Sequence, residues 1–200
     1  MGHDEATTYL RKPEEDRLRD VQINGEPVVE VDAKASHLTI VHGLLGLPLP
    51  NDDLYTVGED LPRSAVKAWT TQSLGKGKPA GQWSRQTAPD QRTVSAKVVQ
   101  KAMLARYPFL ANLRQIVPAP LQAQYGERPE IVALHLQAVE AAALTHAISY
   151  VRNHGHLALP THDGLIVIRS AEEIAKRGLE DGYQRWAKIT PRLDVERAKP

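Results

Sequence analysis

The sequence predicts an α+β fold in which a small antiparallel sheet, built from two β-hairpins, packs on helices. One hairpin signal is Asn24-Gly25, which lies between two extended runs. The other is Asp163-Gly164, which is followed by the β-branched apolar run 165–168. Helical patterns fill most of the sequence between these hairpins, and this order favours a sheet covered by helices.

The first hairpin joins residues 17–23 to residues 27–31, and its return strand delivers Asp32 at its C-terminal end. Strand ends are rigid positions from which catalytic side chains commonly reach a cleft. The second hairpin places His162 and Asp163 at its tip. A purely structural alternative exists for Asp163, because Asp-Gly is also a good turn sequence.

The chain has 200 residues, of which 42% are hydrophobic, and this composition supports one core. We expect a single domain over residues 16–190, with a basic helical insertion at about 60–126. Residues 1–15 are polar and predict a disordered lead-in. Residues 191–200 are assigned as a tail, with an edge strand as the alternative for this segment.

Several classes of protein are disfavoured by the composition. The sequence contains no cysteine, which excludes disulfides, thiolate metal sites and cysteine nucleophiles. The N-terminus is acidic where a signal peptide would be basic and then apolar, and we find no apolar run that approaches membrane-spanning length. We therefore expect a cytoplasmic protein with no membrane partner.

Charge is strongly segregated along the chain, although the net charge is only +1. Residues 1–62 hold five Lys/Arg against thirteen Asp/Glu, whereas residues 63–126 hold ten Lys/Arg against one acid, Asp90. The acidic part could hold cations and the basic part could hold nucleic acid. A solvated basic face with no partner is the alternative.

Two helices are predicted after the first hairpin. Ser36 caps the first, and the second begins with Asp60 as its cap and ends near Gly75. On the second helix Arg63 and Lys67 are four residues apart and project from one face. They are either a solvated pair or a clamp for phosphate oxygens.

A glycine- and proline-rich basic loop follows over residues 75–92, and we expect it to be mobile without ligand. Its cations Lys76, Lys78 and Arg85 are candidate contacts to nucleic acid.

The run 129–153 predicts one long, buried helix that carries Gln137 and Glu140 on one face. A buried carboxylate needs a partner or a wet cleft, so Glu140 predicts either a structural salt bridge or a functional position. Ser170 and Glu173 form a capping-box pattern for a last helix, in which Trp186 is expected to pack in the core.

The two hairpins could bring Asp32 and Asp163 together in one sheet. Two close carboxylates repel unless a divalent cation lies between them. Oxygen ligands without sulfur favour Mg²⁺ or Mn²⁺, and paired metals of this kind serve displacement at phosphorus. With Arg63 and Lys67 as oxygen clamps, the set of residues suits phosphoryl or nucleotidyl transfer.

The order of these motifs resembles the palm and adjoining fingers helix of family A DNA polymerases, the DNA polymerase I type, over roughly residues 16–190. The resembling series is a strand ending in Asp32, Arg63-x-x-x-Lys67 on a helix, Gln137 on a long helix, and His162-Asp163 on a hairpin tip. The single-subunit phage RNA polymerases share that hairpin. A reduced mobile-element or phage-like relative would fit this length.

The resemblance implies a role for each of these residues. It makes Asp32 and Asp163 the metal-binding aspartates, and it places Arg63 and Lys67 on the triphosphate of the incoming nucleotide. Lys67 would give a proton to the leaving pyrophosphate. His162 would contact the primer terminus and would not bind metal, and Gln137 would lie near the primer-template.

The sequence also departs from the family pattern at four positions. His37 stands where DNA-synthesising members carry a glutamate that excludes ribonucleotides, which makes it a candidate nucleotide contact and leaves sugar preference open. Thr71 and Gly75 stand where those members place an aromatic pair against the nascent base. Gly164 replaces an acidic or small polar residue. A thumb does not fit within this length, so synthesis would need a second chain or a further portion of this one.

The predicted function is therefore a DNA polymerase-like nucleotidyltransferase that uses Mg²⁺ or Mn²⁺, nucleoside triphosphates and a DNA or RNA template-primer. An alternative is a catalytically inactive, palm-derived nucleic-acid-binding module. A metal-dependent nuclease that uses the same two acids is a third possibility.

Overall fold

The computed structural model describes residues 9–58 and 60–198. The chain forms two compact units, one made of residues up to Ser36 together with residues from Glu140 onward, and one made of His37–Val139. The sequence predicted a single domain with an insertion at about 60–126. The second unit includes more of the chain than that insertion, because His42 and the start of the long helix also pack within it.

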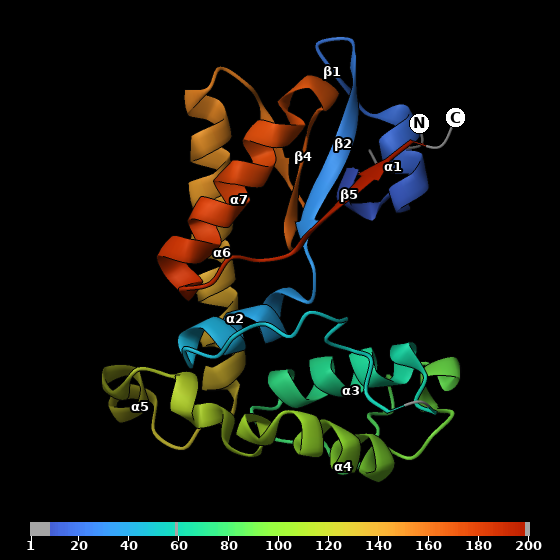
Figure 1. Ribbon diagram of the computed structural model, residues 1–200, viewed down its shortest axis with the longest axis vertical. Coiled ribbons are helices and arrows are strands. Elements are labelled where there is room, and N and C mark those ends of the chain that lie inside the picture. The colour runs from blue at the N-terminus through green and yellow to red at the C-terminus, as the bar shows by residue number, and fades with distance from the viewer. Residues whose placement is uncertain (1–8, 59, 199–200) are drawn as a thin grey trace, which may run out of the picture. The chain divides into compact units, whose positions relative to one another are not determined.

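The first unit is built on a five-stranded antiparallel sheet (Figure 1). The strand order is β1-β2-β4-β3, and β5 also pairs with β2. The strands are β1 (Gln22–Ile23), β2 (Glu26–Ala33), β3 (Ala158–Pro160), β4 (Gly164–Ile168) and β5 (Leu193–Arg197). The predicted fold class, a small antiparallel sheet from two hairpins packed on helices, is confirmed.

Both predicted hairpins are present. Asn24 and Gly25 have φ values of 55° and 80°, the left-handed conformation that a tight hairpin turn of this type requires at both positions. In the second hairpin, the N–H of Thr161 donates to the carbonyl of Gly164 at 2.9 Å. Gly164 is therefore the first residue of β4, and the turn lies before it.

The segment before the first hairpin is helical where we expected a lead-in and a strand. A 3₁₀ helix covers Tyr9–Arg11 and α1 covers Glu14–Asp20, so the predicted strand 17–23 is reduced to β1. Three acids in the first turn of α1 complement the positive end of the helix dipole, a signal that the sequence contains. Residues 1–8 of the predicted lead-in lie outside the described residues.

Helix α1 is fixed to the sheet by a buried ion pair. The guanidinium of Arg17 donates twice to Oε2 of Glu30 on β2, at 3.1 and 2.6 Å. The two side chains are only 11% and 10% exposed. Neither charge is well hydrated, so each is stabilised in the folded state mainly by the opposite charge of its partner.

Replacing Arg17 with methionine is expected to lower the free energy of unfolding by about 2 to 3 kcal/mol, because Glu30 would be left buried without its counter-charge. Arg19→Met is the matched control on the same helix, since Arg19 pairs with Asp16 and Asp20 at the surface. Urea denaturation measures both variants. Equal midpoints for the two would show that the Arg17–Glu30 pair does not hold α1 in place.

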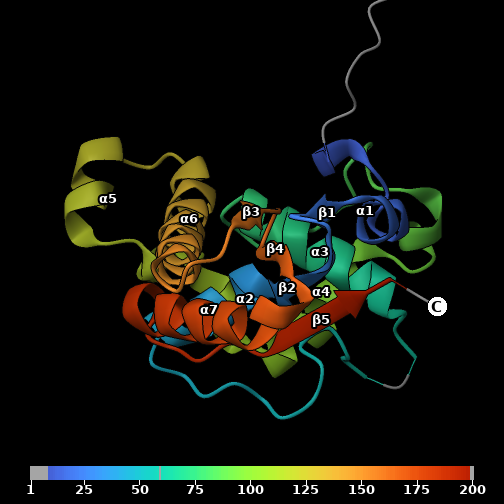
Figure 2. The same cartoon turned by 90° about the horizontal axis from the view of Figure 1, so that it is seen from above.

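The sheet of the first unit is covered by α7 (Glu172–Ala187), which lies against β2 and β4 (Figures 1 and 2). Helix α7 also packs closely on the second half of α6 (Glu130–Asn153). A Cβ at Gly182 would come within 2.4 Å of the Ala143 carbonyl oxygen. Glycine at this position thus allows the two helices to approach.

Three expectations for the end of the chain are corrected. Ser170 does not cap α7, because its N–H and hydroxyl both bond the carboxylate of Glu26 across the sheet edge. Trp186 is 46% exposed and does not lie in the core. The tail assigned to 191–200 contains β5, so the edge-strand alternative is the correct one.

The second unit is helical. Its apolar interior includes the fully buried side chains of Trp69, Met103, Leu110 and Leu136. Its elements are α2 (Ser36–Leu44), α3 (Arg63–Gly75), η2 (Pro89–Arg92), α4 (Ala96–Arg106), η3 (Pro108–Ile116), α5 (Ala119–Tyr125) and the first part of α6. Helix α5 was not predicted, and α3 begins at Arg63 after Pro62 instead of being capped by Asp60.

Helix α6 is 24 residues long and contains an 18-residue stretch with a mean hydropathy of 1.4, so by length and composition alone it could cross a membrane. This corrects the statement that no apolar run approaches that length. Core helices of soluble proteins pass the same test. Here α6 contributes buried side chains to both units, among them Leu136 and Ala147.

Candidate functional site

The candidate site of the first unit is built where β2 ends. Asp32 is paired with Gly164 on β4 along one edge of β2 and with Asp194 on β5 along the other. The N–H of Ala33, the next residue, donates to the carbonyl of Asp163 at 3.2 Å. The backbone register therefore brings Asp32 and Asp163 together, as the two hairpins predicted.

Gly164 is a glycine because of Asp32 and not because of a turn. A Cβ at position 164 would lie 2.5 Å from the carbonyl oxygen of Val31 and 2.7 Å from the Cβ of Asp32. The φ angle of Gly164 is not in the left-handed region. The close approach of β4 to β2 at this point leaves no room for a side chain at position 164.

Burial and neighbouring acids raise the pKa of Asp32 to about 7. Burial is the larger cause, and the charges of Asp163, Asp194 and Glu30 follow. A carboxyl group held this way is only partly ionised at neutral pH. Any cation that bound beside it would restore the ionised form.

The acids present suit Mg²⁺ or Mn²⁺ in their chemistry. Asp32 and Asp163 offer carboxylate oxygens. Burial is the main cause of the raised pKa of Asp32, and the repulsion from neighbouring acids that adds to it is the kind that a divalent cation removes. Within residues 9–58 and 60–198, no three His, Asp or Glu side chains form a ready-made metal cluster. A site with two carboxylates suits Mg²⁺, because this ion commonly binds one or two protein carboxylates and takes its other ligands from water and substrate phosphates.

Sequence reasoning missed Asp194, the acid across from Asp32 on β5. It is bonded to Lys34 at 3.0 Å and adds negative charge next to Asp32. The alternation Leu193-Asp194-Val195-Glu196 is a strand signal that could have found it. Because residues 191–200 were assigned as a tail, the pairing of this segment with β2 was not predicted.

A buried chain of hydroxyl groups lies beside the acid pair. The hydroxyl of Ser36 donates to Oε1 of Glu140, and the hydroxyl of Tyr183 lies 2.7 Å from the same Ser36 oxygen. Burial raises the pKa of Tyr183, with nearby acids as lesser causes, so Tyr183 stays protonated and donates to Ser36. Glu140 thus has a hydroxyl partner in Ser36.

The other predicted site residues are distributed over both units. His162 is exposed at the hairpin tip of the first unit. His37 is half-buried in α2 of the second unit, where Gln137 is exposed on α6. The remaining candidates of the second unit are all exposed cations, namely Arg63, Lys67, Lys76, Lys78 and Arg85.

Arg63 and Lys67 lie one turn apart on α3, as their spacing predicted. The guanidinium of Arg63 is bonded to the carboxylate of Asp53 and lies 5.3 Å from the centre of the Tyr55 ring. Although burial opposes the shift, the hydrogen bonds from Arg63 and from the N–H of Tyr55 lower the pKa of Asp53. Asp53 therefore stays ionised and holds Arg63.

The basic loop 75–92 makes hydrogen bonds with side chains of α3 and with the segment that follows it, and its mobility without ligand stays a prediction. The indole of Trp69 donates to the Ala80 carbonyl at 2.7 Å, and the indole of Trp83 donates to the Val94 carbonyl at 2.8 Å. The amide of Gln72 on α3 bonds the backbone of the loop twice, at 2.7 and 2.8 Å. Hydrogen bonds from α3 thus fix the path of the loop and the positions from which its cations project.

Comparison with known proteins gives a structural match but no sequence match. No family model matches the sequence, and no curated protein matches it. The structure is similar to the polymerase domain of Pol1 from M. smegmatis, a family A DNA polymerase solved with DNA primer-template and dNTP, with a TM-score of 0.52 and 14% identity. The match covers 90% of this chain and 41% of that one, so the chain has a polymerase-like fold and spans less than half of the neighbour.

Proposed function

We propose that this chain is a metal-dependent nucleotidyltransferase that joins a nucleoside triphosphate to the 3′ end of a nucleic acid. The observation that carries the proposal is the meeting of Asp32, near the end of β2, with Asp163, in the turn just before β4, within a polymerase-like fold. The raised pKa of Asp32 adds support, because acids held at a cost to stability are common at functional sites.

In this proposal Asp32 and Asp163 hold Mg²⁺ or Mn²⁺. Such an ion, when bound, supplies activation of the attacking hydroxyl and neutralises charge on the phosphate. The primer 3′-oxygen forms a bond to the α-phosphorus, and the bond from that phosphorus to the bridging oxygen breaks to release pyrophosphate. The proton of the hydroxyl passes to water.

The side chains of the second unit would bind the leaving part of the nucleotide. Lys67 is exposed and can donate a proton to pyrophosphate as it leaves, while Arg63 would exchange its partner Asp53 for phosphate oxygens. His37 is proposed as a nucleotide contact. His162, exposed at the hairpin tip, would contact the primer terminus.

The partner in this proposal is a DNA or RNA template-primer. Gln137 and the loop cations Lys76, Lys78 and Arg85 are exposed and would contact it. The chain spans 41% of the structural neighbour, so we propose that a second chain or a further portion supplies the thumb function. We also propose that the protein acts on DNA in the cytoplasm, in a process such as DNA replication.

One observation favours a second function, an inactive module that binds nucleic acid. Arg63, which the active protein would use on the triphosphate, is already bonded to Asp53 within its own unit. If that pair does not open, the triphosphate loses a contact while the exposed loop cations keep their affinity for phosphate.

Primer extension tests the proposal. The protein is incubated with a labelled template-primer, all triphosphates and Mg²⁺ or Mn²⁺, beside Asp163→Asn as the matched control. Extension by the wild type and its loss in the variant are expected. Binding of the primer-template without extension would support the inactive module instead, and shortening of the primer would support a nuclease.

A further inference from the structure

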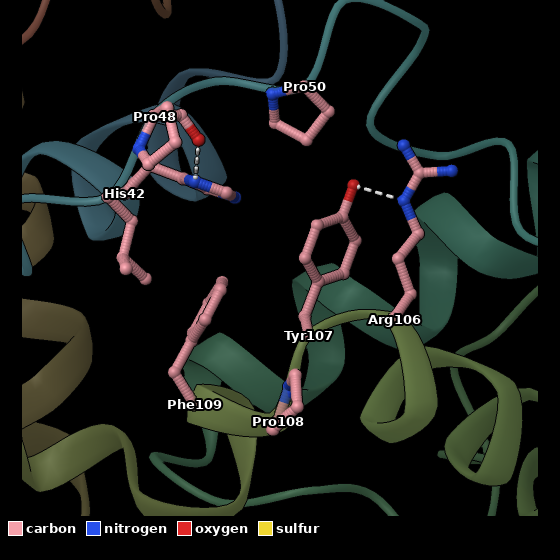
Figure 3. A pocket seen from close by; sticks show the side chains of 8 residues that line it. His42, Pro48, Pro50, Arg106, Tyr107, Pro108 and Phe109 are labelled. Carbon is pink, nitrogen blue, oxygen red and sulfur yellow. Dashed lines mark hydrogen bonds between the residues drawn. The ribbon is translucent and has the colours of Figure 1, made fainter.

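The second unit contains a pocket that the proposed function does not use. Its volume is about 510 Å³, which lies within the range of small-molecule sites. It lies where the end of α2 and the segment after it face the start of η3 (Figure 3). The lining residues are His42, Leu47, Pro48, Pro50, Arg106, Tyr107, Pro108 and Phe109.

The walls of the pocket are flat and mainly apolar. Three rings meet edge to face or tilted, with centroids 5.1 Å apart for His42 and Phe109, 5.5 Å for His42 and Tyr107, and 5.6 Å for Tyr107 and Phe109. Three prolines complete the walls. Flat rings and proline surfaces favour a flat guest that can stack or meet a ring edge.

Most polar groups at the pocket are already bonded. Arg106 donates to the carbonyl of Thr56, to Asp52 at 2.7 Å and to the Tyr107 hydroxyl at 2.7 Å. That hydroxyl in turn donates to the carbonyl of Leu54 at 3.1 Å. The charge of the Arg106 guanidinium is therefore balanced by Asp52. A charged ligand would find no free counter-charge in Arg106 or Tyr107.

His42 is the exception. Its Nδ1 lies 2.9 Å from the carbonyl of Pro48, which can only accept, so Nδ1 carries the proton and Nε2 is an acceptor. Nε2 is buried and has no hydrogen-bond partner among the described residues. Burial lowers the pKa of His42, so the ring stays neutral. Figure 3 shows the ring reaching into the space beside Tyr107 and Phe109.

We propose that this pocket binds a flat, uncharged aromatic molecule that donates one N–H or O–H to Nε2 of His42. The apolar walls select the aromatic ring, and the acceptor without a hydrogen-bond partner, Nε2 of His42, selects the donor. An unsatisfied buried acceptor is unfavourable in the free protein, so a guest with a donor gains more than a guest of the same shape without one.

The same geometry restricts how the donor arrives. Nε2 exposes less than 1 Å² to solvent, so bulk water does not hydrate it. A donor must come within about 3 Å of it, which requires a small movement of the surrounding rings. Binding therefore changes the environment of Tyr107 and Phe109 as well as that of His42.

Indole and 1-methylindole make the test, because they share a ring system and differ in the single N–H. Each is titrated into the full chain, and the amide and aromatic NMR resonances are followed. We expect indole to bind with shifts confined to the pocket residues, and 1-methylindole to bind about tenfold more weakly. Equal affinities, or no saturable binding of indole at millimolar concentration, would overturn the proposal.

Two variants sharpen the result. His42→Phe keeps a ring but removes the acceptor, and it should bind the two molecules equally. Leu134→Ala, at an exposed apolar side chain outside the pocket, should bind indole as the wild type does. A clear indole preference retained in His42→Phe would contradict the assignment. If circular dichroism shows that His42→Phe is unfolded, the ratio of the two affinities in the wild type decides.

Discussion

Asp32→Asn is expected to make the protein more stable at pH 8 while it abolishes nucleotide incorporation. Asparagine has the shape of the carboxyl group but never carries its charge, so the cost of burying that charge disappears, together with the repulsion from Asp163 and Asp194. We expect a gain of about 1 to 3 kcal/mol in the free energy of unfolding, after allowance for solvent screening. Loss of a metal-binding acid should lower incorporation by roughly 10³-fold or more.

The pH dependence follows from the direction of the shift. The pKa of Asp32 is about 7 in the folded chain and near 3.8 when unfolded, so the folded state binds more protons between these values. Stability from this group is full below about pH 4 and is lost as the pH rises to 7. Urea denaturation between pH 4 and 8 should therefore show a slope in the wild type that Asp32→Asn lacks.

Two controls accompany this experiment. Asp90→Asn changes an exposed acid of the basic loop and should leave the slope unchanged. Millimolar Mg²⁺ should raise the melting temperature of the wild type at pH 8 more than that of Asp32→Asn, since a ligand of the folded state stabilises it. A variant that is less stable than the wild type at pH 8 would show that Asp32 has a structural role instead.

Gly164→Ala is expected to lower the free energy of unfolding by about 3 to 5 kcal/mol. The added methyl group would lie 2.5 Å from the Val31 oxygen and 2.8 Å from the Cα of Asp32. These neighbours are mostly backbone atoms of the central strand, so the strain is relieved only if β2 and β4 separate where the two acids meet.

The matched control is Gly81→Ala, because nothing lies within 4 Å of a Cβ at Gly81 and its φ angle is not in the left-handed region. Thermal melts followed by circular dichroism should show a large drop for Gly164→Ala and little change for Gly81→Ala. Similar melting temperatures for Gly164→Ala and the wild type would mean that β4 does not lie this close to β2.

Sequence patterns predicted the elements whose signals are local. Asn24-Gly25 determines its own turn, and the apolar run that forms α6 is long enough to be helical in any context. The short elements α5 and β5 were missed or left open because each depends on partners remote in sequence. Residues 193–197 become a strand only because β2 offers them an open edge.

The same limit applies to the candidate site: the parts that local sequence features specify were predicted, and the parts that depend on distant pairings were not. Asp32 and Asp163 were found because strand ends and hairpin tips are local features. Two further parts, Asp194 opposite Asp32 and Asp53 bonded to Arg63, depend on pairings that single motifs do not specify. The reason for Gly164 also required the structure, since a turn and a close approach both favour glycine.

The position of β2 in the sheet has a consequence for how the chain folds. Its residues are made before those of its partners β4 and β5, which lie more than 130 residues further along the chain. Such distant pairings form slowly, because a long loop must close before any contact is gained. During synthesis β2 therefore has only its local partner β1 until β4 and β5 are made. The place where Asp32 and Asp163 meet is among the last parts of the protein to be assembled.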